Sequence, residues 1–276
     1  MKKTLKALGK AACYAFYFLV MQNIVALAVM AGDFVQFVQR YESLWNSNPL
    51  GLLELFMARM ELEQSGLSLT VILWSNVAAV AGLWLFFRLR RRRLCREIRL
   101  VRPDRRTAVY TALIGLTAPA VIALATELIP FTPEQLAALE ANSAYLETGE
   151  TPVLLALVSV LAAPVAEEVV YRGLVYSRLR RALPVWLSMI LSAAVFASGH
   201  PGIVWFVSAF LAGLLLAWVY ERTGSLAAPI LVHMLNNASL GYPGWLAIAC
   251  VPVFVWALVR VSGPGKFPRT APSARP

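Results

Sequence analysis

The chain has 276 residues, of which 59% are hydrophobic and 14% are charged, and its mean hydropathy is +0.66. This composition excludes an ordinary soluble domain and predicts an all-α, multi-pass integral membrane protein. Its three cysteines lie far apart without CxxC spacing, which excludes a disulfide framework and a cysteine metal site. The formal net charge of +10 at pH 7 could indicate nucleic acid as a partner.

The excess positive charge is concentrated between Arg88 and Arg106, where ten arginines separate two apolar runs. Positively charged loops between membrane helices face the cytoplasm, so topology explains the charge. No aromatic residues alternate with these arginines as they would in a strand-binding groove. We therefore expect membrane lipids, and no nucleic acid, as partners of this loop.

The apolar runs predict a helical bundle of about eight transmembrane segments. Four lysines precede the first run and basic residues follow the last, so both termini are predicted to be cytoplasmic, in a bacterial plasma membrane. The predicted segments are 11–31, 67–87, 108–129, 151–172, 184–199, 203–220, 226–240 and 245–259.

Two connecting segments have patterns of their own. Residues 33–66 are expected to form a loop whose short helix places Leu52, Phe56 and Met60 on one face, against the membrane surface. The sequence Thr132-Pro-Glu-Gln135 is a capping box, which predicts the start of a short surface helix.

The fourth apolar run ends with Glu167, Glu168 and Arg172. Ionisable side chains inside a membrane are costly, and this makes them functional candidates. On a helix, Glu168 and Arg172 are i and i+4 and can form an ion pair. Glu167 lies about 100° further round, so it can face a cavity as a general base.

The two histidines of the chain, His200 and His233, both lie within or beside apolar segments. Phe196 precedes the first by one helical turn and can fix its ring, and Asn237 follows the second by one turn. Such an amide could orient the histidine, bind a metal or stabilise an oxyanion. Together with the glutamates, these residues form a mutually compensating polar cluster, typical of a membrane active site or transport site.

Three short motifs follow one another in successive apolar segments: Glu167-Glu168-x-x-x-Arg172, Phe196-x-x-x-His200 and His233-x-x-x-Asn237. In this order they resemble the motifs of the CPBP family, the CAAX-protease and bacteriocin-processing group, also called Abi or type II CAAX prenyl endopeptidases. The resemblance covers roughly residues 150–240. It implies an intramembrane endopeptidase that acts on a peptide or a lipidated, CAAX-like protein.

The resemblance also implies roles for the motif residues. Glu167 would activate a water with help from His200, while His233 and Asn237 would hold the oxyanion or a metal. Glu168, Arg172 and Phe196 would support the site.

Family members are described both as metalloproteases and as glutamate-type proteases. The set Glu167, His200 and His233 matches a catalytic zinc site with one open position, whereas a water activated by Glu167 needs no metal. The absence of an HExxH pair favours the metal-free form, and zinc stays open.

The same cluster leaves two other functions open. A transporter or proton relay also uses Glu, His and Arg in membrane helices, but it predicts internal repeats, and the two halves of the sequence show no convincing similarity. A non-catalytic immunity scaffold predicts degraded motifs, and all three motifs are intact.

The expected organisation has three parts. Residues 1–107 form N-terminal membrane helices with the arginine-rich cytoplasmic loop, residues 108–262 form the membrane protease core, and residues 263–276 form a disordered tail.

One geometric problem arises from these boundaries. If the fifth segment runs straight from Arg181, His200 lies about 27 Å away, near the opposite membrane face, while Glu167 lies near the cytoplasmic side. A shared site therefore requires that residues 174–186 run partly along the interface or that the helices tilt strongly.

Overall fold

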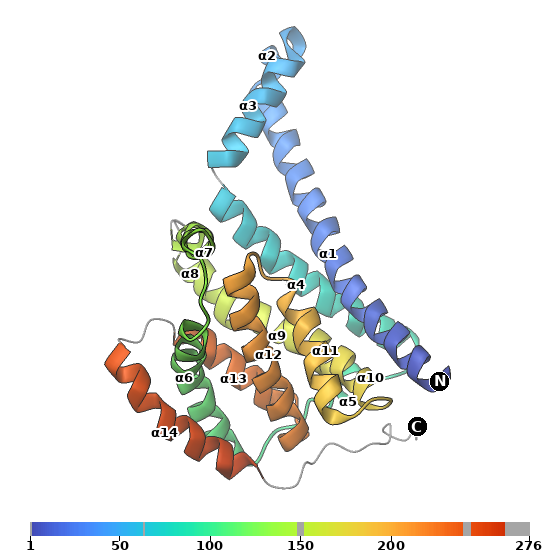
Figure 1. The fold of residues 1–276 in the computed structure, drawn as a ribbon. Coiled ribbons are helices and arrows are strands. Elements are labelled where there is room, and N and C mark those ends of the chain that lie inside the picture. The colour runs from blue at the N-terminus through green and yellow to red at the C-terminus, as the bar shows by residue number, and fades with distance from the viewer. Residues whose placement is uncertain (1, 63, 148–151, 240–243, 263–276) are drawn as a thin grey trace.

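The computed structural model describes residues 2–62, 64–147, 152–239 and 244–262 (Figure 1). Every regular element in these ranges is helical, which confirms the all-α fold. The helices are α1 (Lys2–Arg40), α2 (Glu42–Ser47), α3 (Pro49–Leu62), α4 (Gln64–Leu89), α5 (Leu94–Glu97), α6 (Arg105–Glu127), α7 (Pro133–Glu147), α8 (Pro152–Ala156), η1 (Leu157–Ala162), α9 (Ala163–Glu167), η2 (Glu168–Tyr176), α10 (Ser177–Arg180), α11 (Val185–Ala197), α12 (Ile203–Thr223), α13 (Ala227–Ala238) and α14 (Gly244–Val261).

A helical membrane bundle is confirmed, because five stretches of helix are long and apolar enough to cross a bilayer. Each of the eight predicted apolar segments also coincides with a helix, and how many of them cross stays a prediction. The five stretches are Thr4–Arg40, Leu69–Leu89, Arg105–Glu127, Pro152–Arg180 and Ile203–Thr223.

The N-terminal helices form an arm that extends away from the other helices, with α2 and α3 at its tip (Figure 1). The predicted loop over residues 33–66 is wrong, because α1 continues to Arg40 and α3 packs back against it. Phe37, Leu52 and Phe56 are buried against one another. The apolar face of α3, which was expected to lie on the membrane surface, is thus covered by the end of α1.

The arginine-rich segment between α4 and α6 enters the core of the protein. Leu94 and Ile98 are buried in the main hydrophobic cluster, and the Ile98 carbonyl accepts a hydrogen bond of 2.9 Å from the Tyr220 hydroxyl. A Cβ on Gly173 would lie 2.8 Å from Cβ of Ile98, so the close approach of the loop to η2 requires a glycine. The loop therefore helps to fix the position of the central helix.

The central helix runs without interruption from α8 to α10 and includes two π-helical stretches, η1 and η2. Its predicted end at Arg172 is wrong, since the helix continues to Arg180. The continuation is stable because cations beyond the predicted end are neutralised. Arg178 pairs with Glu97, and Arg180 Nη2 lies 3.0 Å from Glu221 Oε1.

The capping box predicted before α7 is confirmed. The Thr132 amide donates to Gln135 Oε1 over 2.9 Å, and the Gln135 amide donates to Thr132 Oγ1 over 3.4 Å. The tail predicted to be disordered, residues 263–276, lies outside the described residues. The three-part division of the chain stays a prediction.

Candidate active site

Glu167 and His200 reach similar levels because the central helix and α11 form an antiparallel hairpin. Glu167 precedes the end of α10 at Arg180 by 13 residues, and His200 follows the start of α11 at Val185 by 15 residues. The Ser192 hydroxyl donates to the Tyr171 carbonyl over 3.1 Å, halfway along this hairpin. The longer helix thus removes the depth problem without a detour of residues 174–186 along the interface.

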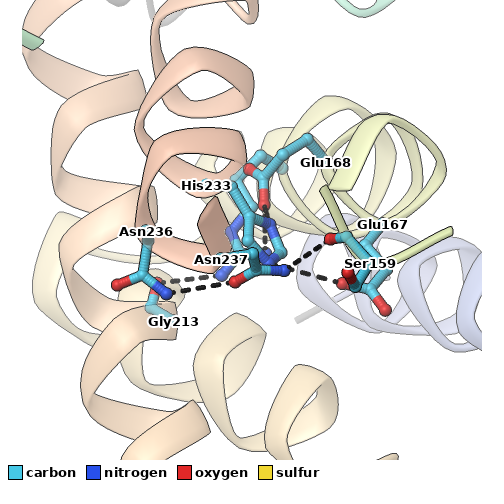
Figure 2. A network of polar contacts seen from close by, with 8 residues as sticks. Ser159, Glu167, Glu168, Gly213, His233, Asn236 and Asn237 are labelled. Atoms are coloured by element: carbon cyan, nitrogen blue, oxygen red, sulfur yellow. Dashed lines mark hydrogen bonds and ion pairs between the residues drawn. The ribbon is translucent and has the colours of Figure 1, made fainter. Parts of the chain in front are cut away.

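Glu168 lies at the centre of a buried polar cluster (Figure 2). Its side chain and that of Arg172 are both 0% exposed, and Arg172 Nη1 lies 2.8 Å from Glu168 Oε1. Nη2 of the same arginine donates to the Gly213 carbonyl over 3.2 Å, and its guanidinium lies 4.4 Å from the centre of the Phe196 ring. His233 Nδ1 lies 3.0 Å from Glu168 Oε1.

His233 faces both glutamates, one with each ring nitrogen. Its Nε2 lies 3.7 Å from Glu167 Oε2, and the Glu167 side chain is 20% exposed. Glu168 is paired with Arg172, and a carboxylate accepts hydrogen bonds, so Nδ1 is assigned as the donor to Glu168 and Nε2 is the ring nitrogen that faces Glu167. A separation of 3.7 Å is less than two hydrogen-bond lengths, so one water can bind both Nε2 and Glu167.

Phe196 connects the two imidazole rings. Its ring centre lies 5.0 Å from that of His200 and 5.9 Å from that of His233. His200 Nδ1 is buried, and no hydrogen-bond partner for it occurs in the part of the chain that the structure describes. His200 therefore joins the cluster through an aromatic contact with Phe196.

Asn237 is held from the opposite side by the first π-helical stretch. Its Nδ2 donates to the Ser159 carbonyl over 2.8 Å, and its Oδ1 accepts from Asn236 Nδ2 over 3.1 Å. The helix that carries it, α13, lies close to α6 at Gly115, where a Cβ would be 2.8 Å from the Val232 carbonyl oxygen. Asn237 is thus fixed beside the glutamates from two neighbouring helices.

Three participants were not predicted from the sequence. Ser159 and Gly213 contribute only backbone carbonyls, for which the side-chain sequence carries no signal. Asn236 lies next to a predicted residue, and its side chain supports Asn237. An asparagine pair in an apolar helix was a signal that could have found it.

The predicted zinc ligands are not gathered into a metal site. Glu167 and His233 lie near each other, but within the described ranges no three His, Cys, Asp or Glu side chains form a group that could hold a metal ion. A tetrahedral zinc site needs three protein ligands around one point. Zinc at Glu167, His200 and His233 therefore stays a prediction, and no chemical step is derived through a metal.

Comparison with known proteins identifies the part of the chain that holds this cluster. Residues 149–239 match the model of the Rce1-like family, described as type II CAAX prenyl endopeptidase Rce1-like. The Bacillus subtilis (strain 168) protein named "Putative membrane peptidase YdiL" is 24% identical over 98 residues. These residues are 36% of this chain and 40% of that relative. No solved structure matches the chain.

The matched range contains every motif residue, from Glu167 to Asn237. The resemblance indicated by the three motifs is thereby confirmed, and residues 149–239 are the region in which this chain is similar to the Rce1-like type II CAAX prenyl endopeptidases.

Proposed function

We propose that this protein is an intramembrane endopeptidase that hydrolyses a peptide bond in a membrane-associated or lipidated, CAAX-like protein. The family match supports a protease. The observation that carries the proposal is the contact of His233 with both glutamates, one fully buried and paired with Arg172 and the other partly exposed. This division separates a structural carboxylate from a reactive one.

Glu167 is the proposed general base. It takes a proton from a water held between its carboxylate and His233 Nε2, and the water oxygen attacks the carbonyl carbon of the substrate. The resulting tetrahedral intermediate collapses when the C–N bond breaks. Glu167 then returns its proton to the leaving amine, so the products are a free carboxylate and an amine.

Asn237 and His200 are the proposed oxyanion donors. Asn237 Nδ2 donates to a backbone carbonyl, that of Ser159, in the structure, and a substrate carbonyl is a chemically equivalent acceptor. His200 contacts the same Phe196 ring as His233, and its imidazole can donate a hydrogen bond to the oxyanion. Preorganised donors of this kind contribute about 3–4 kcal/mol each to transition-state stabilisation.

Glu168, Arg172 and Phe196 are proposed as positioning residues. The carboxylate of Glu168 fixes the ring of His233 through Nδ1. Arg172 pairs with that carboxylate, and its guanidinium is held in turn by the Gly213 carbonyl and the Phe196 ring. A metal-free mechanism is the form proposed. The zinc form, with Glu167, His200 and His233 as ligands, is the alternative that the experiment distinguishes.

The test is cleavage of a quenched peptide library, including peptides with a lipidated C-terminus, by the full chain purified in detergent. Glu167→Gln should lower the rate by about 10²–10⁴-fold. The matched variant Glu127→Gln removes an exposed carboxylate at the end of α6 and should leave the rate within about two-fold.

A zinc chelator should leave wild-type cleavage unchanged. Loss of cleavage in the presence of the chelator would establish the zinc form. Equal cleavage by wild type and Glu167→Gln would remove this cluster from the mechanism and return the transport and scaffold functions to consideration.

A further inference from the structure

A second site lies away from the glutamates, where the start of α1 meets the end of α4 and α10. A cavity of about 630 Å³ opens there, lined by the cations Lys10, Arg90, Arg92 and Arg178 and by aromatic side chains that include Tyr14 and Phe86. In Figure 1 the N-terminal end of α1 lies beside α10. The positive-inside pattern places this end of the bundle on the cytoplasmic side.

The acidic groups around the cavity do not balance its positive charge. Glu97 pairs with Arg178, and the same carboxylate lies 3.7 Å from Arg181 and 3.9 Å from Arg92. One carboxylate is thus shared by three guanidinium groups, while Lys10 and Arg90 add further charge to the lining.

Arg178 is the buried member of this set. Its side chain is 8% exposed, and its Nε has no hydrogen-bond partner within the described residues. The guanidinium lies 5.7 Å from the centre of the Tyr14 ring. A guanidinium that lines a cavity with three more cations is suited to a phosphate group, because arginine binds phosphate through several donors at once.

The surroundings of the cavity favour a lipid over free phosphate. Phe86 lines the cavity and is 40% exposed, and Leu85 and Leu89 on the same helix are 49% and 75% exposed. Apolar side chains on the outer surface of a membrane helix contact acyl chains. We infer that this cavity binds the phosphate headgroup of an acidic phospholipid, whose acyl chains lie along the end of α4.

Lipid binding is measured on the full chain in detergent by native mass spectrometry, with titration of phosphatidylglycerol or phosphatidylcholine. Wild type should retain one phosphatidylglycerol in preference to phosphatidylcholine. The double variant Lys10→Gln/Arg90→Gln should bind phosphatidylglycerol about 25-fold more weakly, since each basic residue near an anionic headgroup contributes about five-fold. Both residues are exposed, so the fold should be kept.

The matched control Arg93→Gln/Arg96→Gln removes two exposed charges from the same loop but none from the cavity. It should stay within about two-fold of wild type. An equal loss in both double variants, or no preference between the two lipids, would overturn the site. Displacement of the lipid by millimolar inorganic phosphate would assign the cavity to free phosphate instead. None of these outcomes depends on the proposed protease activity.

Discussion

At the scale of single residues, two adjacent glutamates that look alike in the sequence contact His233 in different ways. Glu168 is fully buried and shared by His233 and Arg172, whereas Glu167 is partly exposed. The pairing of Glu168 with Arg172 could be predicted, because side chains at positions i and i+4 lie on the same face of an α-helix. The contact with His233 could not, because it joins positions 65 residues apart.

Substitution of the buried Glu168 should affect folding more than substitution of the partly exposed Glu167. Glu168→Gln leaves Arg172 buried without its charge partner, which costs about 3–5 kcal/mol of unfolding free energy. Glu167→Gln should cost less than about 1 kcal/mol. Thermal unfolding of both variants in detergent measures the difference. Equal loss in the two would show that Glu167 has a structural role too.

Glu97 makes the protein sensitive to acid. Burial raises the pKa of Glu97, but the hydrogen bond and charge of Arg178, with the charges of Arg181 and Arg92, outweigh it, so the pKa lies below the ordinary 4.5. A lowered folded-state pKa stabilises the fold above pH 4.5, and this stabilisation is lost as the pH falls through the folded-state value.

Glu97→Gln should therefore lower the unfolding free energy by about 1–3 kcal/mol at pH 7. The difference from wild type should shrink below pH 4.5. Unfolding midpoints recorded between pH 3 and pH 7 give the comparison, and a difference that is constant across this range would contradict the ion-pair explanation.

At the scale of elements, the apolar runs correctly predicted where helices form. The charged residues gave a wrong prediction of where the central helix ends. Arg178 and Arg180 looked like the cytoplasmic end of a span, but they are neutralised by Glu97 and Glu221 from distant segments. Ile98 lies among ten arginines and is nevertheless 2% exposed. Pairing and burial of this kind depend on tertiary contacts, which a single sequence does not contain.

The contact between the arginine-rich loop and η2 depends on a missing side chain. Gly173→Ala would place a Cβ 2.8 Å from Cβ and Cγ2 of Ile98, and overpacking of this kind costs about 1–3 kcal/mol. Gly32→Ala is the matched control, since nothing lies within 4 Å of its Cβ, and alanine should stabilise helix α1 by about 0.5–1 kcal/mol. Unfolding midpoints should shift in opposite directions. An unchanged unfolding midpoint in Gly173→Ala would mean that the arginine-rich loop moves to make room for the added Cβ.

At the scale of the whole molecule, the bundle was predictable and the arm was not. Composition and run length were enough to indicate membrane helices. The first helix has 39 residues, or about 58 Å at 1.5 Å per residue, against a hydrocarbon core of about 30 Å. Its last turns pack on α3 through Phe37 and Phe56. The sequence did not indicate this helical hairpin, because the segment that forms it has mixed charge.

The orientation of the molecule can be tested with its own cysteines. Cys95 lies exposed in the arginine-rich loop, so the double variant Cys13→Ala/Cys250→Ala leaves one reporter on the predicted cytoplasmic face. A membrane-impermeant maleimide should label Cys95 in inverted vesicles and leave it unlabelled in intact cells. Labelling in intact cells would reverse the predicted topology.

The central helix is fixed at two levels, by Glu168 with Arg172 and His233 at one and by Arg178 and Arg180 with their glutamates at the other. The π-helical η2 begins at the first level, with Glu168 and Arg172, and ends just before Arg178 at the second, and each of its hydrogen bonds spans one more residue than in an α-helix. The number of residues in η2 therefore sets the rotational phase between the two levels. Apolar exchanges in this stretch change packing alone, whereas an insertion or deletion of one residue rotates the glutamates away from His233.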